Sequence, residues 1–424
     1  MKKKFFHFLL YLIYKIIFDM AKNGEFSFSD LNSLMNKNSK WGGLMSDGAG
    51  VSEIKDYIPT GNYILNAAFT GSLFQGIPGN RSVEIFGPSG TGKTYILLNI
   101  AREAQKKGYY IIWYDSENAI ESSQVRKFGC DLNKFRYEPV QTVQEFRTSI
   151  TTIVDALIEQ REKGNAIPKL MIILDSAGNL ATQKEIDDAK AGQEKQDMTR
   201  AKVMKSIFRI IMSKLGIIGA SFLFSNHCYQ TLDLFSQQQA AGGTGAEYGA
   251  SVILSVNKAK LKEGNSQIGI VVNAKPTKNR FCKPIVIKFH IDYNKGLNPY
   301  VGLDEYFSWD RCGLAFGKFI TEKEYNKSPN EEYKRVEKSD GEVLYFVPSD
   351  SARTLCCDDG TTFPKIKVFT PEVWTTERLK RLDEYIMSEF RYAETAGIND
   401  LFEDEEDDTN ENTTDDLIKN QLEE

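Results

Sequence analysis

A complete phosphate-binding motif constrains this chain more than any other feature of its sequence. Residues 87–94 read GPSGTGKT and fit the pattern GxxxxGK[ST]. They follow an apolar run at 83–86 and open a stretch whose apolar residues have helical spacing. Glycines let the backbone curl until successive N–H groups point at one anion, and the following helix adds its positive end. The motif therefore predicts a strand, a phosphate-binding loop and a helix in that order.

This loop and a second apolar run together predict a site for ATP and Mg²⁺. Lys93 would place its charge against the β- and γ-phosphates, and the Thr94 hydroxyl would lie beside the metal. Asp175 ends the apolar run at 170–174, where a carboxylate is costly to bury unless it meets a cation or hydrogen-bond donors. We therefore expect Asp175 and Thr94 to orient Mg²⁺. The residues expected to bind the nucleotide are Gly87, Pro88, Ser89, Gly90, Thr91, Gly92, Lys93, Thr94 and Asp175.

Short apolar runs that alternate with helical patterns predict an α/β fold with a mostly parallel central sheet. The expected strands in this part are 83–86, 109–114, 170–174 and 222–224, and the expected helices are 93–107, 142–162 and 198–213. After residue 250 the pattern becomes rich in strands, and adjacent strands predict hairpins at a sheet edge at 251–256, 268–273 and 285–291. A smaller mixed region follows, with a hairpin around 339–341 and a helix at 376–396.

A carboxylate that orients water is the remaining requirement for hydrolysis, and the strand at 109–114 supplies two candidates. Asp115 and Glu117 both follow this strand directly. In an open α/β sheet, ligands bind at the carboxyl ends of the strands. We predict that Glu117 is the base or the water-positioning residue, with Asp115 as its rival.

Composition excludes several classes of protein. Of the 424 residues, 41% are hydrophobic and 26% charged, which argues against a wholly disordered, collagen-like or polytopic membrane protein. Six cysteines without a CxxC pair predict neither a disulfide scaffold nor a zinc ribbon, so a reducing intracellular setting fits. The net charge of the whole chain is −5. Residues 399–424 alone have a net charge of −11, so the other residues have a net charge of +6. A basic body with an acidic tail is typical of nucleic-acid-binding proteins, although a solubilising terminus has the same composition.

Six segments in a fixed order point to a family. They read SVEIFGPSGTGKT, WYDSENAI, MIILDSAGNLA, DMTRAKVMKSIFRI, FSNHCYQT and AGGTG. Together they resemble the RecA-type recombinases, and most closely the T-even bacteriophage branch, over about residues 55–300. The resemblance implies a RecA-like ATPase core with a catalytic Glu117. It also implies that His227, which follows Asn226, senses the γ-phosphate, and that Lys278 and Arg280 reach across to the ATP of a neighbouring protomer. A plain solvated edge would also explain these two cations.

The resemblance further implies two loops that touch single-stranded DNA, at about 183–199 and 231–248. On the helix that follows the first loop, Lys202, Lys205 and Arg209 share one face, and Val203, Ile207 and Ile210 share another. A basic stripe opposite a core face fits contact with phosphates, although it also fits an ordinary solvated face. The residues expected to contact DNA are Met198, Arg200, Lys202, Lys205, Ser206, Arg209, Phe235, Gly242 and Gly243.

These expectations divide the chain into segments. We expect 1–19 to be a non-native extension, because its lysines and short apolar run are followed by no cleavage site and because Met20 opens MAKNGEFSFSD, which reads like an ordinary cytosolic start. We expect 20–60 to contact a neighbouring protomer and 61–298 to be the ATPase core. A C-terminal region would span 299–398, and a disordered acidic tail 399–424.

The function implied by the resemblance is a single-stranded-DNA-dependent ATPase that forms a helical filament of its own copies. It would catalyse homologous pairing and strand exchange with homologous double-stranded DNA in recombination, repair and recombination-dependent replication. A single-strand-binding protein and a mediator or loader are expected partners. No membrane is expected, and the location would be the cytoplasm of a bacterial host. Two alternatives stay open, namely a hexameric helicase of RecA fold and a non-hydrolysing protein that coats single-stranded DNA or acts as a mediator.

Overall fold

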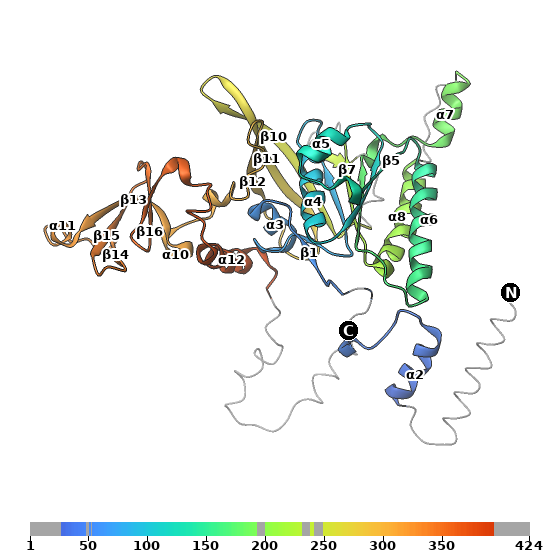
Figure 1. Ribbon diagram of the computed structural model, residues 1–424, viewed down its shortest axis with the longest axis horizontal. Helices are drawn as coiled ribbons and strands as arrows, with labels where there is room; N and C mark the ends of the chain where they lie inside the picture. Colours follow the sequence, from blue (N-terminus) through green and yellow to red (C-terminus); the bar gives the residue numbers. More distant parts are fainter. Residues whose placement is uncertain are drawn as a thin grey trace, which may run out of the picture.

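A mixed sheet of eight strands is the centre of the computed structural model (Figure 1). The structure describes residues 27–47, 51, 53–192, 200–230, 238–240 and 249–393. The strand order is β12-β11-β10-β3-β7-β6-β4-β5, and the six strands from β10 to β5 are parallel to one another. The bounds are β3 (Ser82–Phe86), β4 (Tyr110–Asp115), β5 (Phe135–Pro139), β6 (Leu170–Asp175), β7 (Ser221–Asn226), β10 (Val252–Glu263), β11 (Ser266–Asn279) and β12 (Ile287–Asp292).

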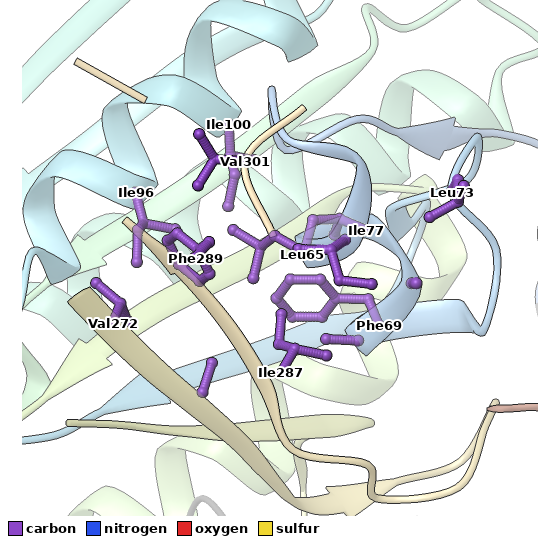
Figure 2. Packing of buried hydrophobic residues seen from close by; sticks show 14 of the residues in the cluster. Leu65, Phe69, Leu73, Ile77, Ile96, Ile100, Val272, Ile287, Phe289 and Val301 are labelled. Carbon is purple, nitrogen blue, oxygen red and sulfur yellow. The ribbon is translucent and has the colours of Figure 1, made fainter. Parts of the chain in front are cut away.

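Helices cover both faces of this sheet. Successive strand residues point to opposite faces, so Trp113 packs in the cluster on one face and Tyr114 in the cluster on the other. The first cluster contains the apolar sides of α3 (Tyr63–Thr70) and α4 (Lys93–Lys106), and the second those of α6 (Val143–Glu162) and α8 (Arg200–Ile218). Figure 2 shows part of the first cluster, to which α3 contributes Phe69, α4 contributes Ile96 and β12 contributes Phe289.

A second sheet of five antiparallel strands forms the C-terminal region, in the order β14-β15-β13-β16-β17 (Figure 1). Its strands are β13 (Leu314–Thr321), β14 (Lys334–Glu337), β15 (Val343–Pro348), β16 (Thr354–Cys357) and β17 (Thr362–Pro364). Helix α12 (Thr376–Phe390) connects this region to the core, because the buried Asp383 carboxylate accepts hydrogen bonds from the Leu73 backbone N–H at 2.5 Å and the Ser72 hydroxyl at 3.1 Å.

Shorter elements complete the described chain. The remaining helices are α2 (Phe28–Asn38), α5 (Ser122–Lys127), α7 (Gln183–Lys190), α10 (Trp309–Cys312) and α11 (Glu322–Tyr325), the remaining strands are β1 (Tyr57–Ile58), β2 (Ile77–Pro78), β8 (Cys228–Gln230) and β9 (Gln238–Ala240), and the 3₁₀ turns are η1 (Met45–Asp47), η3 (Leu132–Lys134), η4 (Ala177–Asn179), η5 (Leu303–Glu305) and η6 (Lys365–Lys367). Across the described segments, no helix combines the length and the apolar character needed to cross a lipid bilayer.

The predicted α/β fold with a mostly parallel sheet is confirmed, as are the hairpin edge after residue 250 and the turn that joins β14 to β15. The helix predicted at 376–396 ends earlier, at Phe390, because Arg391 has extended backbone angles. Strand β5 was not predicted, since its sequence FRYEP contains no continuous apolar run.

Phe69→Ala should lower the free energy of unfolding by about 3–5 kcal/mol, because the ring is fully buried between α3 and the sheet and its removal leaves a cavity. Denaturant unfolding followed by circular dichroism would measure this change. Tyr110→Ala is the control, since Tyr110 is 44% exposed. Equal losses in the two variants would contradict the assignment of this cluster as the core.

Candidate nucleotide-binding site

The phosphate loop joins the carboxyl end of β3 to the amino end of α4. Helix α4 begins after Gly92, which adopts a left-handed φ of 89° and has no side chain to accept the first N–H groups of the helix. These groups are therefore available to an anion. Gly87 is required for a different reason, because a Cβ there would lie 2.1 Å from the carbonyl oxygen of Val256 in β10.

Lys93 is almost fully buried at the inner side of this loop. Its Nζ donates hydrogen bonds to the carbonyl oxygens of Gly87 at 2.9 Å and Pro88 at 3.0 Å. Burial lowers the pKa of Lys93, and the nearby carboxylates of Asp175 and Glu117 oppose this effect. A phosphate is a stronger acceptor than a carbonyl because it carries charge, so an ammonium group in this place is well suited to bind one.

Asp175 connects the phosphate loop to two neighbouring strands. Its Oδ2 accepts a hydrogen bond from the Thr94 hydroxyl at 2.7 Å, and its Oδ1 accepts one from the Ser225 hydroxyl at the end of β7. Burial raises the pKa of Asp175, and the bonds from Ser225 and Thr94 oppose the rise. These oxygen donors fit Mg²⁺, which prefers hard oxygen ligands and usually keeps waters and substrate phosphates in its shell. Among the described residues, no cluster of three or more His, Cys, Asp or Glu side chains is arranged to hold a metal ion.

Glu117 lies on the wall of the same cavity and contacts the predicted γ-phosphate sensor. Its Oε1 accepts a hydrogen bond from the Ser176 hydroxyl at 2.6 Å and lies 2.7 Å from Nε2 of His227. Burial by itself would raise the pKa of Glu117, but the bonds from Ser176 and His227 outweigh it and lower the pKa. Glu117 is therefore ionised and able to accept a proton or orient a water.

Asp115, the rival of Glu117, has a structural environment. Its carboxylate accepts hydrogen bonds from the backbone N–H groups of Glu117 and Ala119, both at 2.9 Å, and it is 1% exposed. It therefore shapes the turn that carries Glu117. Glu117 lines the cavity of 910 Å³ around the phosphate loop, and Asp115 is not among the residues that line it.

The far end of this cavity is formed by residues that the sequence did not reveal. Tyr95 packs edge-on against Phe128 with ring centroids 4.8 Å apart, and its hydroxyl accepts a hydrogen bond from the Leu297 N–H at 3.0 Å. Tyr293 lies beside them with 62% of its surface exposed. One signal would have located this segment. Since β12 is antiparallel to β11 and β11 to β10, β12 runs in the direction of β3 and ends at the phosphate edge.

A basic hollow of 850 Å³ lies along α8, away from the phosphate cavity. Lys202, Lys205, Ser206 and Arg209 line it on the helix side. Arg280 also lines it, so the structure brings one predicted trans cation together with the predicted DNA-binding stripe.

Arg81 is a further cation of this hollow, and one that the sequence did not suggest. Burial lowers the pKa of Arg81, and the charge of Arg280 lowers it further. Lys278 is not among the lining residues. It is half-buried on β11, opposite Ile253 of β10.

Comparison with known proteins identifies the family. The family model of the RecA N-terminal domain matches residues 29–298, which is more than half of the chain. This chain belongs to the RecA family. It is 31% identical over 253 residues to the recombination and repair protein of Enterobacteria phage T4, which covers 59% of this chain and 62% of the phage protein. The predicted resemblance to this family is confirmed.

Bacterial relatives are also similar to this chain. Protein RecA of Thermotoga neapolitana is 29% identical over 259 residues, covering 59% of this chain and 70% of that protein. Protein RecA of Acidothermus cellulolyticus is 28% identical over 289 residues, covering 66% and 77%. These relatives are named as a recombination and repair protein and as RecA proteins.

Of the predicted DNA contacts in this RecA-family chain, Arg200 has a contact within the protein and four others cannot be placed. Met198, Phe235, Gly242 and Gly243 lie outside the described residues, as do the segments 1–19 and 399–424. Arg200 donates to the carbonyl oxygens of Ala177, at 3.3 Å, and Gly178, so it anchors the amino end of α8.

Two details of this region were predicted wrongly. Ile210 is not on the core face of α8, because it is 40% exposed; the buried residues there are Met204, Ile207, Phe208, Ile211, Leu215 and Ile218. The segment predicted as the first DNA loop also begins as helix α7. A capping box between Thr182 and Glu185 starts this helix.

Lys93→Ala should weaken ATP binding about ten- to a hundredfold, because it removes a charge-assisted hydrogen bond worth roughly 1.5–3 kcal/mol. Titration with a fluorescent ATP analogue would measure the affinity. Lys106→Ala is the control, since Lys106 lies in the last turn of the same helix and pairs with Glu103. Wild-type affinity in Lys93→Ala would show that the loop does not hold phosphate.

Proposed function

We propose that this chain is a single-stranded-DNA-dependent ATPase that assembles as a helical filament on DNA. The filament would pair its strand with homologous double-stranded DNA and catalyse strand exchange in recombination, repair and recombination-dependent replication. One observation carries the proposal: Glu117 contacts His227 at 2.7 Å on the wall of the phosphate cavity. His227 follows β7 and precedes the predicted DNA loop at 231–248, so this contact links the site of hydrolysis to the chain that would hold DNA.

Hydrolysis would use the residues around the phosphate loop in separate roles. Lys93 binds the β- and γ-phosphates, and the N–H groups at the start of α4 hold the phosphate chain in place. Thr94 and Asp175 would hold Mg²⁺, which stabilises the charge that develops on the transferred phosphoryl group. Glu117 orients the attacking water and accepts its proton.

Coupling to DNA would pass through His227. A γ-phosphate oxygen placed beside Glu117 competes for the ring nitrogen that now faces the carboxylate. When His227 turns from Glu117 to the phosphate, the backbone that continues from β7 moves with it. ATP binding would in this way set the position of the second DNA loop, and hydrolysis would release it. A ligand shifts a conformation only through contacts that differ between the two states, and this exchange supplies such a contact.

DNA would bind through the cations of the hollow on α8. Lys202, Lys205 and Arg209 are exposed along one side of the helix, as expected for contact with phosphates. Such contacts read no base sequence, so specificity would come from base pairing with the second duplex. By analogy with the phage relative, the protein would act in the cytoplasm of a bacterial host, with a single-strand-binding protein and a loader as partners.

The position of Arg280 supports a head-to-tail assembly. The backbone N–H of Arg280 donates to the carbonyl oxygen of Ser251. The backbone N–H of Ser251 in turn donates to the carbonyl oxygen of Ser82, at the amino end of β3. The phosphate loop starts at the other end of this five-residue strand, about 17 Å away. Arg280 is therefore too far from its own nucleotide, and a neighbouring copy is the partner whose ATP it would reach, together with Lys278. Such a heterologous contact produces a ring or an open helix.

An ATPase assay with and without single-stranded DNA, combined with electron microscopy of the assembly, tests this proposal. We expect DNA-stimulated phosphate release and open helical filaments in the presence of ATP. Closed rings of six protomers would favour the helicase alternative. Filaments without phosphate release would favour a coating or mediator protein.

Glu117→Gln should reduce the rate of ATP hydrolysis by about 10²- to 10⁴-fold and leave ATP affinity within a few-fold of wild type, because it removes the proton acceptor and not a phosphate ligand. Single-turnover phosphate release would measure the rate. Asp115→Asn is the comparison and should lower the melting temperature, since Asp115 accepts backbone N–H groups of the turn. Normal turnover in Glu117→Gln would transfer the catalytic role to another group.

Lys205→Ala and Arg209→Ala should each weaken binding to single-stranded DNA equally for all sequences. Each should also reduce the slope of log K against log salt by about one, because one phosphate contact is lost. Fluorescence anisotropy at several salt concentrations would measure both. Lys214→Ala is the control, because Lys214 lies on the same helix but pairs with Asp155 at 2.5 Å. A loss that depends on sequence would contradict backbone binding.

A further inference from the structure

A second lysine reaches the phosphate loop from outside it. Lys258 belongs to β10, which runs parallel to β3 and pairs with it as far as Ser255 and Phe86. Strand β10 then continues past the point where β3 turns into the loop. The Nζ of Lys258 donates a hydrogen bond to the carbonyl oxygen of Ser89 at 3.1 Å.

A further observation places this ammonium group against the loop. A Cβ on Gly90 would lie 2.5 Å from Nζ of Lys258, so the lysine occupies the space that glycine leaves. The carbonyl oxygens of Gly87, Pro88 and Ser89 thus hold two ammonium groups side by side.

The backbone of Lys258 is held by the sheet, whereas its side chain is exposed and able to change its contact. Lys258 pairs with Val272 of β11, which is fully buried, so its backbone belongs to the firm part of the sheet. Its side chain is exposed, and no ion pair forms with it among the residues that the structure describes. A lysine of this kind has a flexible stem with a compact charge, which suits a phosphate oxygen.

We propose that Lys258 binds the terminal phosphate of ATP within the same protomer, as a second cis cation beside Lys93. The inference rests on the proposed nucleotide site. Lys93 lies against the carbonyl oxygens of residues 87 and 88, and Lys258 lies against the carbonyl oxygen of Ser89, a residue that lines the phosphate cavity. A phosphate oxygen is a stronger acceptor than the Ser89 carbonyl, so Lys258 would exchange one for the other. Since ADP lacks the terminal phosphate, Lys258 distinguishes ATP from ADP.

Binding of a non-hydrolysable ATP analogue and of ADP to Lys258→Gln tests this inference. We expect the affinity for the ATP analogue to fall about tenfold, as for the loss of one charge-assisted hydrogen bond, with ADP affinity within twofold of wild type. Lys258→Arg should restore most of the lost affinity, because it restores the charge. Lys262→Gln is the matched control, since Lys262 lies about 13 Å further along the same strand, and it should bind both nucleotides as wild type does.

Two outcomes would overturn the inference. Unchanged affinity of Lys258→Gln for the ATP analogue would show that the lysine does not touch the nucleotide. Equal losses for both nucleotides would show that it only supports the loop through Ser89. A melting curve of each variant confirms the fold, and an exposed side chain makes unfolding no concern. If the wild-type protein fails to bind ATP, the proposed function is refuted. If the wild type binds the ATP analogue and Lys258→Gln binds it equally well, only the inference about Lys258 is refuted.

Discussion

The buried carboxylate of Asp175 is the interaction on which the site depends. It accepts hydrogen bonds from the hydroxyl groups of Thr94, at the start of α4, and Ser225, at the end of β7. One side chain of β6 thus connects the phosphate loop with β6 and β7. A carboxylate with 2% exposure is stable only with such donors or with a cation. Because a buried carboxylate needs a cation or hydrogen-bond donors, Asp175 is also well suited to bind a metal ion that is coordinated by phosphate.

Strand direction explains why so many functional groups meet at one edge. Parallel strands end at the same side of a sheet, so β3, β4, β6 and β7 deliver Lys93, Glu117, Asp175 and His227 to one cavity. Two antiparallel turns then return the chain to this edge at β12, where Tyr293 follows. The opposite edge carries Arg280 and Arg81. Because the two edges are separated, Arg280 of one protomer would contact the ATP of the neighbouring protomer and not its own.

The sequence was sufficient for the core and insufficient for its borders. Apolar runs of three to six residues that alternate with helical patterns predicted the parallel sheet, and the motif at 87–94 predicted the phosphate loop. Strand β5 was not predicted because FRYEP contains no continuous apolar run, and of the five-stranded C-terminal sheet only the hairpin between β14 and β15 was predicted. Helical periodicity located the basic stripe on α8 but misplaced Ile210, since periodicity gives an angle around a helix and not the extent of the layer beneath it. Lys258 escaped prediction because its role depends on how far β10 continues past β3.

The close approach of Gly87 to the carbonyl oxygen of Val256 limits how this loop can diversify. A single added carbon would force two hydrogen-bonded strands apart, so position 87 admits no side chain while the sheet keeps its register. Ser89, by contrast, is exposed to solvent and makes its contact through its backbone. A substitution at position 89 should therefore keep the backbone contact of the loop, whereas any side chain at position 87 would disturb the sheet.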